Sequence, residues 1–232
     1  MIHLEREPGG VALLRLARPP VNALDLELVQ AIERGVRAVG DSDARALVLT
    51  GDGSCFSAGI DTKLAPTYDA QQRRDSINAI NQLVATICSA SVPVLAAING
   101  HAMGGGLVIA LACDLRLAGR GEHRLALNEV SAGVPFPAGP LAVVRAELDP
   151  SVMRDLCLTG RAVGPDEALA LRIVEAVLDP PELLDRARER ALELASFPAY
   201  ALVKAQVRGR LISELEQIAA GDDPLIRRAD RG

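Results

Sequence analysis

The chain is poor in aromatic residues: its 232 residues include three phenylalanines, two tyrosines and no tryptophan. Proteins that bind nucleic acid use aromatic stacking platforms together with clustered basic side chains. Here the lysines and arginines are scattered, and the formal net charge is −5. We therefore expect no nucleic-acid partner.

Metal-ligand and disulfide patterns are also missing. The four cysteines stand far apart with no CxxC pair, and the three histidines have no ligand spacing. This arrangement predicts neither a metal site nor a disulfide framework, and it fits a reducing compartment. The positions are Cys55, Cys88, Cys113, Cys157, His3, His101 and His123.

Long apolar runs are absent as well. The longest, residues 107–113, is far shorter than the roughly 20 residues that a membrane-spanning helix needs. The first residues, MIHLEREPGG, carry acidic groups where a secretory signal has a positive segment and an apolar core. We expect a cytoplasmic protein that does not associate with membranes.

Short strand-like runs alternate with helical patterns through the first two-thirds of the chain. This alternation is typical of a layered α/β domain, and 49% hydrophobic residues support one sizeable core. The first helix is expected to have its N-cap near Asp25. The expected strands are 11–16, 44–51, 92–100 and 114–119, and the expected helices are 24–39, one within 70–90, and one opened by the glycines at 104–106.

The pattern becomes wholly helical after about residue 178. The stretch PPELLDRARERALELA has prolines at its start, apolar residues on one face and charges on the other. We therefore divide the chain into a core domain, 1–178, and a helical C-terminal region for docking or oligomerisation, 179–232. The last residues, 222–232, are expected to be frayed.

Two loops share a design in which small residues follow a buried strand. They are CFSAGID (55–61) and AMGGGLV (102–108). A glycine inside a helix is less favourable than alanine by roughly 1 kcal/mol, so three together need a reason. One reason is tight packing of the helix start against a neighbouring strand. The other is that free N–H groups at a helix N-terminus hold an anion or a developing oxyanion.

Known glycine-rich motifs do not fit these loops. No lysine follows the glycines as in a phosphate-binding P-loop, and the spacing of a dinucleotide-binding fingerprint is missing. The CFSAG stretch has Cys55 where a nucleophile elbow has its first glycine, and no histidine is placed as a base for Ser57. Neither Ser57 nor Cys55 is therefore favoured as a nucleophile.

Taken together, CFSAGIDTK and NGHAMGGGLVIALACDLRLAG resemble the crotonase superfamily, which contains the enoyl-CoA hydratases and isomerases. The resemblance extends from RPPVNALDLELV near the start to GRAVGPDEALALRIVEAV (160–177). It implies a ββα superhelix with a helical C-terminal region, an acyl-CoA substrate and no separate cofactor. It also implies assembly as a homotrimer or a dimer of trimers.

The resemblance assigns roles to residues in both loops. Ile60 and Gly105 would each supply one backbone N–H to an oxyanion hole for the thioester carbonyl. Lys63 would reach a CoA phosphate. The residues that would line the acyl-CoA site are Ala58, Gly59, Asp61, Thr62, Asn128, Val108 and Phe136.

The same resemblance reduces the number of reactions that the site could catalyse. Enoyl-CoA hydratases use two glutamates, and the matching positions here are Val108 and Glu129. Because a valine neither accepts nor donates a proton, two-carboxylate hydration is disfavoured. One carboxylate suffices for an allylic proton shift, and LNEVSAGVPFP (127–137) is most similar to mitochondrial-type Δ3,Δ2-enoyl-CoA isomerases. We expect Val108 and Phe136 to raise the pKa of Glu129 by desolvation.

Two alternatives remain open. In the first, the protein is an acyl-CoA hydrolase or an atypical hydratase, and Glu129 activates a water molecule. A polar group facing Val108, such as Asp69 or a nearby arginine, would favour this alternative. A non-catalytic acyl-CoA binder has the same fold, since fold alone does not establish activity.

Overall fold

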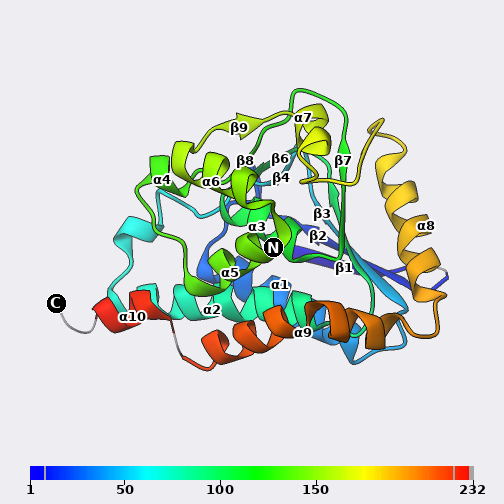
Figure 1. The fold of residues 1–232 in the computed structure, drawn as a ribbon, viewed down its shortest axis with the longest axis horizontal. Coiled ribbons are helices and arrows are strands. Elements are labelled where there is room, and N and C mark those ends of the chain that lie inside the picture. Colours follow the sequence, from blue (N-terminus) through cyan, green and yellow to red (C-terminus); the bar gives the residue numbers. More distant parts are fainter. Residues whose placement is uncertain (8, 222, 230–232) are drawn as a thin grey trace.

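A six-stranded sheet forms the centre of the fold in the computed structural model, which describes residues 1–7, 9–221 and 223–229. Its strand order is β1-β2-β3-β5-β7-β10, parallel except for β1, which runs antiparallel to β2 (Figure 1). All residues of β3 and β5 are buried, as expected where helices cover both faces of a parallel sheet. The strands are β1 (Ile2–Arg6), β2 (Val11–Leu16), β3 (Ala46–Gly51), β5 (Val94–Ile98), β7 (Leu115–Gly119) and β10 (Ala176–Leu178).

A second, smaller sheet carries the segments that lead into the two loops. Its order is β4-β6-β8-β9, with β4, β6 and β8 parallel and β9 antiparallel to β8. The strands are β4 (Cys55–Ser57), β6 (His101–Met103), β8 (Leu125–Ala126) and β9 (Ala162–Val163). Because β4 and β6 are neighbours, the loops that follow them emerge side by side.

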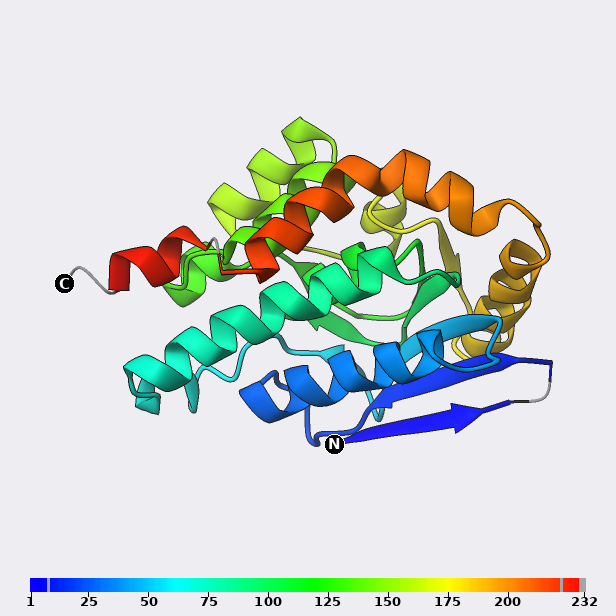
Figure 2. The same cartoon turned by 90° about the horizontal axis from the view of Figure 1, so that it is seen from below.

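Ten α-helices and one short 3₁₀ helix are present in the described residues. Helices α1, α2 and α9 lie alongside one another on one side of the large sheet (Figure 2). None of the helices in these ranges combines the length and the apolar run needed to cross a bilayer. The helices are α1 (Leu26–Gly40), η1 (Ala65–Thr67), α2 (Ala70–Ser89), α3 (Gly105–Ala112), α4 (Glu129–Ala132), α5 (Ala138–Glu147), α6 (Pro150–Thr159), α7 (Pro165–Ala170), α8 (Leu183–Ala195), α9 (Tyr200–Ala219) and α10 (Pro224–Ala229).

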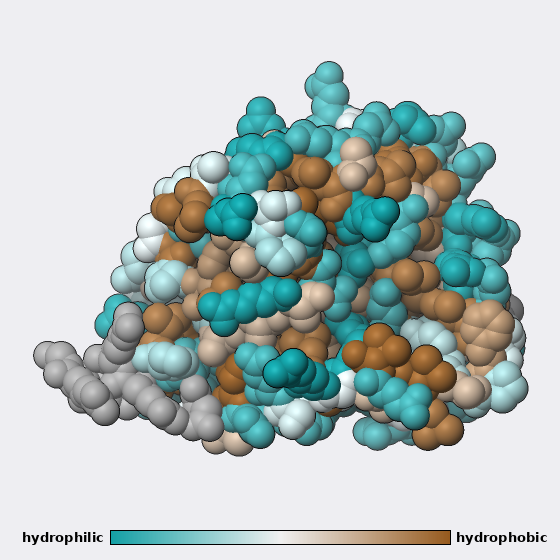
Figure 3. All heavy atoms as spheres, viewed as in Figure 1, coloured by the Kyte–Doolittle hydropathy of each residue, from teal (hydrophilic) through white to brown (hydrophobic). Residues whose placement is uncertain are grey.

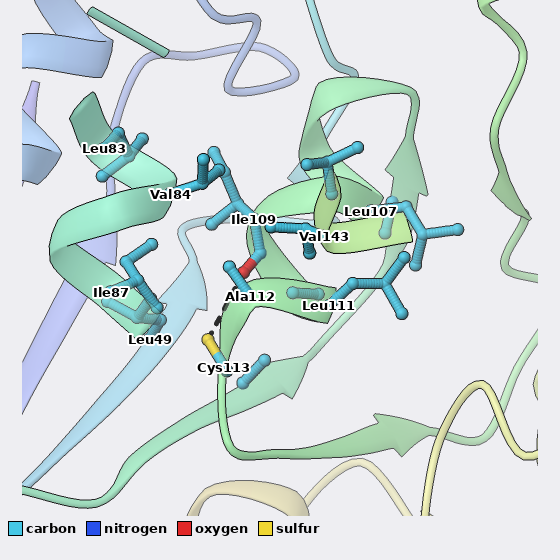
Figure 4. Close-up of a cluster of buried hydrophobic side chains, with 14 of the residues drawn as sticks. Leu49, Leu83, Val84, Ile87, Leu107, Ile109, Leu111, Ala112, Cys113 and Val143 are labelled. Carbon is cyan, nitrogen blue, oxygen red and sulfur yellow. Dashed lines mark hydrogen bonds between the residues drawn. The ribbon is translucent and has the colours of Figure 1, made fainter. Parts of the chain in front are cut away.

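Alternating residues of the large sheet face two hydrophobic cores. In β3, Leu47 and Leu49 face the larger core, whereas Ala46 and Val48 face the smaller one. In the larger core, side chains of α2, α3 and α5 point toward one another (Figure 4). The smaller core is covered by α8 through Leu183, Ala187 and Ala191. The C-terminal helices are therefore packed onto the cores built by the first part of the chain.

Most predicted elements are confirmed, and the differences have local causes. Asp25 is the N-cap of α1, where its side chain accepts a hydrogen bond from the Leu28 N–H at 2.8 Å. The expected strand 92–100 instead ends at Ile98, and the chain enters the second sheet at His101. Gly100 forms this corner, because a Cβ there would lie 2.0 Å from the Ser54 carbonyl oxygen.

The expectation of a frayed end is wrong for residues 224–229, which form α10. Asp223, which is fully buried, holds the start of this helix. Its carboxylate accepts from Asn81 Nδ2 and from the N–H of Ala138 and Leu225, each at 2.8 Å. The segment is thereby fixed to α2 and α5. Residues 222 and 230–232 lie outside the described residues.

A buried ionic cluster fixes α9 to the core. Asp114 accepts from Lys204 Nζ at 2.8 Å, from Arg208 Nη1 at 3.0 Å and from the Val94 N–H at 2.8 Å. Arg208 also pairs with Glu147 at 2.7 Å. Lys204 and Arg208 of α9 thus depend on carboxylates that belong to the core.

Candidate active site

Two of the three consecutive glycines at the start of α3, Gly104 and Gly106, are needed for different physical reasons. Gly104 has φ +48°, and a Cβ there would lie 3.3 Å from both Asn128 Oδ1 and Glu129 Oε1. At Gly106 a Cβ would lie 2.5 Å from the Ser57 carbonyl oxygen. Gly106 therefore permits close packing of the helix against β4, whereas Gly104 leaves room for the Glu129 carboxyl group. The packing explanation is thus supported at Gly106, and the role of the N–H groups stays a prediction.

The first loop lies directly against the second. Gly59 has φ +77°, and a Cβ there would lie 2.4 Å from the Met103 carbonyl oxygen and 3.3 Å from the Gly105 nitrogen. A side chain at Gly59 would push the two loops apart, so only glycine fits this position.

The backbone N–H groups of Ile60 and Gly105 are both left unused by the secondary structure. In the parallel bridge between Leu24 and Ile60, the Leu24 N–H donates to Gly59 O and the Asp61 N–H donates to Leu24 O. The N–H of Ile60 takes no part in this bridge and points to its other side. The first hydrogen bond of α3 is from the Val108 N–H to Gly104 O, so the Gly105 N–H has no acceptor within the helix.

These two residues line one cavity of about 520 Å³ together with Glu129. Its wall is mainly apolar and comes from α1, α2, α3, α5 and the segments 60–68 and 132–137. The cavity thus combines two candidate oxyanion donors, a carboxyl group and room for an acyl chain. The predicted site residues that line it are Ile60, Asp61, Thr62, Gly105, Val108 and Glu129.

The other predicted site residues lie behind or beside the cavity wall. The Ala58 N–H donates to the Val21 carbonyl oxygen, and Gly59 shapes the loop. Lys63 is exposed, and Asn128 lies beside Gly104. Phe136 packs against the larger core instead of lining the cavity. Val108 thus lines the same cavity as Glu129, whereas Phe136 does not line it.

Glu129 is a buried carboxyl group with little stabilisation of its charge. It begins the short helix α4, and its Oε2 atom is buried without a hydrogen-bond partner among the described residues. Burial raises the pKa of Glu129 to about 7, although a hydrogen bond from its own backbone N–H acts in the opposite direction. A group with this pKa is suited to both accept and donate a proton near neutral pH.

The sequence interpretation missed an ion-paired triad and one face of α2. Arg18 bridges Asp25 at 2.9 Å and Asp61 at 3.0 Å, which ties the Gly59 loop to the start of α1. Arg73, Ser76, Ile77 and Ile80 of α2 also line the cavity. Their spacing of three, four and seven residues places them on one helical face, a signal that was present in the sequence. Asp69 is the N-cap of α2 and does not line the cavity.

The fold is that of the crotonases. The structure of the probable enoyl-CoA hydratase EchA3 from Mycobacterium tuberculosis superimposes with a TM-score of 0.87 at 25% identity, covering 95% of this chain and 93% of that chain. Human mitochondrial delta3-delta2-enoyl-CoA isomerase superimposes with a TM-score of 0.86 at 23% identity, covering 99% and 95%. The predicted α/β superhelix is thereby confirmed.

Sequence comparison identifies the family. The profile described as Enoyl-CoA hydratase/isomerase matches residues 6–228. The probable enoyl-CoA hydratase EchA17 of Mycobacterium tuberculosis is 32% identical, covering 92% of this chain and 83% of that protein. Carnitinyl-CoA dehydratase of Escherichia coli is 32% identical, covering 92% and 82%. The chain belongs to the enoyl-CoA hydratase/isomerase family and is an acyl-CoA enzyme.

Proposed function

We propose that this enzyme is a Δ3,Δ2-enoyl-CoA isomerase with Glu129 as its single acid/base group. The observation that carries the proposal is the pairing of Glu129 with an aliphatic residue, Val108, on the wall of the same cavity. One carboxyl group moves a proton between two carbons of the substrate, whereas hydration with a second carboxylate at Val108 is impossible.

The proposed reaction follows from the positions of these groups. The thioester oxygen lies between the N–H groups of Ile60 and Gly105, and ionised Glu129 removes a proton from C2 of a 3-enoyl-CoA. The electron pair delocalises over C2, C3, C4 and the thioester oxygen. Glu129 then returns its proton to C4, and the double bond is left between C2 and C3. Loss of a single donor from an oxyanion hole typically costs about 3–4 kcal/mol of transition-state stabilisation.

Hydration is the second candidate. The names of the two curated relatives favour it, and Arg73 lines the cavity that Val108 and Glu129 also line. In this case Glu129 would activate a water molecule for attack on a 2-enoyl-CoA.

Separate incubations with a 3-enoyl-CoA and a 2-enoyl-CoA distinguish the candidates. We expect the 3-enoyl-CoA to acquire the absorbance of a conjugated thioester, with no release of free CoA. Efficient hydration of the 2-enoyl-CoA would overturn the proposal, and so would thioester hydrolysis. Binding of both compounds without turnover would point to a non-catalytic acyl-CoA protein.

The pH dependence provides a further prediction. Glu129 acts as a base only when it is ionised, and burial raises its pKa from 4.5 to about 7. We expect kcat/KM for a 3-enoyl-CoA to fall as the pH decreases through about 7 and to level off above it. The measurement is an initial-rate profile between pH 5 and pH 9, roughly two units on either side of that pKa. A rate that stays constant from pH 9 down to pH 5 would show that burial of Glu129 has no effect on the reaction.

We also propose that the C-terminal helices mediate self-association. On α9 the side chains of Leu202 and Val207 are 71% and 77% exposed, and Val203 is half exposed. In the space-filling view, hydrophobic side chains reach the surface where α9 begins (Figure 3). Apolar side chains grouped at the surface are typical of subunit interfaces. Light scattering coupled to size exclusion measures the number of subunits.

A further inference from the structure

The wall of the cavity contains a hydroxyl group that the proposed reaction does not use. Ser76 Oγ on α2 is buried, and no atom of the described residues forms a hydrogen bond with it. Its neighbours on the same helical face, Ile77 and Ile80, are apolar and also line the cavity. A buried hydroxyl without a partner is unfavourable unless a bound molecule supplies one.

The side chain of Arg73 lies three residues before Ser76 on the same helix. Arg73 lines the same cavity, is exposed, and forms no ion pair with the described residues. Two carboxylates of this wall, Asp25 and Asp61, are already matched because both pair with Arg18. With a rise of about 1.5 Å per residue, Arg73 and Ser76 are separated by less than one turn along α2. We call these two residues the polar strip.

The polar strip and the oxyanion hole would bind different parts of the substrate. The hole is formed by the backbone of Ile60 and Gly105 and belongs to the thioester carbonyl, whereas the strip is formed by side chains of α2. A purely hydrocarbon acyl chain would leave the Ser76 hydroxyl without a partner when it fills the cavity. A chain with an oxygen atom at this depth would accept a hydrogen bond from Ser76, and a carboxylate would in addition pair with Arg73.

We infer that the acyl group of the substrate carries a hydrogen-bond-accepting oxygen, a hydroxyl or a carboxylate, that is bound by Ser76 and Arg73. This inference rests on the proposed function in one respect: it assumes that the cavity holds the acyl part of an acyl-CoA. It does not depend on the reaction that follows.

The test is the binding of saturated acyl-CoAs, which undergo neither isomerisation nor hydration. Six- and eight-carbon acyl groups are compared in three matched forms that end in a methyl, a hydroxyl or a carboxylate, and Kd is measured by titration calorimetry. We expect the hydroxyl form to bind roughly threefold to tenfold more tightly than the methyl form. The carboxylate form, held by a charge-assisted bond, should gain at least about tenfold.

Two variants assign the preference to the polar strip. Ser76→Ala should remove the advantage of the hydroxyl form and leave the methyl form bound as tightly as before or more tightly. Arg73→Gln should weaken only the carboxylate form. The matched control is Ser89→Ala, an exposed serine at the end of the same helix, which should change none of the Kd values.

The possible failures are distinguishable. Tightest binding of the methyl forms at both lengths would overturn the inference and leave the isomerase proposal intact. An equal loss for all three forms in Arg73→Gln would assign this residue to the CoA part and overturn its role in the strip. If none of the acyl-CoAs binds, both this inference and the proposed function are wrong.

Discussion

Replacement of Glu129 by glutamine is expected to lower the turnover of a 3-enoyl-CoA by between about 10² and 10⁴-fold. The amide retains the size of the side chain but neither accepts the C2 proton nor delivers it to C4. Because Glu129 is proposed to perform both transfers, no other group on the cavity wall would compensate. Single-turnover rates measured at saturating substrate separate this loss from any change in binding.

Two comparisons make this result specific. Glu122→Gln, at an exposed glutamate, should retain wild-type activity. The Glu129→Gln variant itself should unfold at a temperature no lower than the wild type above pH 7, because a neutral amide avoids the burial of an ionised carboxylate. A variant that folds normally and still isomerises within a few-fold of the wild-type rate would exclude Glu129 as the base.

Removal of the Asp114 carboxylate is expected to lower the free energy of unfolding by about 3–5 kcal/mol. Asp114→Ala leaves Lys204 without a carboxylate and Arg208 with Glu147 alone, and both cations are buried. It also removes the acceptor of the Val94 N–H. Urea unfolding at equal protein concentration, followed by circular dichroism, measures the change.

The matched control for this variant is Asp43→Ala. Asp43 pairs with Arg6 at 3.1 Å, but its side chain is 90% exposed. An exposed pair contributes less than about 1 kcal/mol, so the midpoint should barely move. Equal effects of the two substitutions would mean that the Asp114 cluster does not hold α9 to the core.

The sequence predicted helix and strand boundaries well where a single residue and its near neighbours in the chain form the boundary. Asp25 marks the start of α1 because its side chain satisfies an N–H group only three residues away. The end of the chain shows the opposite case. Asp223 orders α10 through Asn81 and Ala138, which are distant in the sequence. No local pattern carries that information.

Some features of the candidate site are likewise predictable from the sequence, and others depend on tertiary packing. The glycine residues of the two loops are visible in the sequence and indicate the family. Val108 and Glu129 stand at the two positions where hydratases have glutamates, so the sequence also shows that only one of the two carboxyl groups is present. Phe136 was expected to line the acyl-CoA site, but it packs against the larger core and does not line the cavity. The spacing of Arg73 and Ser76 places them on one face of α2, but nothing in the sequence shows that this face borders a cavity.

Residue types and short-range spacing are sufficient to indicate the fold class, the crotonase resemblance and the absence of a second glutamate at Val108. The packing of distant segments places Gly59 against Gly105, desolvates Glu129 and buries Ser76 Oγ without a partner among the described residues. These properties depend on which distant segments exclude water from a group. Burial and hydrogen-bond partners are therefore set by packing, whereas chemical identity is set by the sequence.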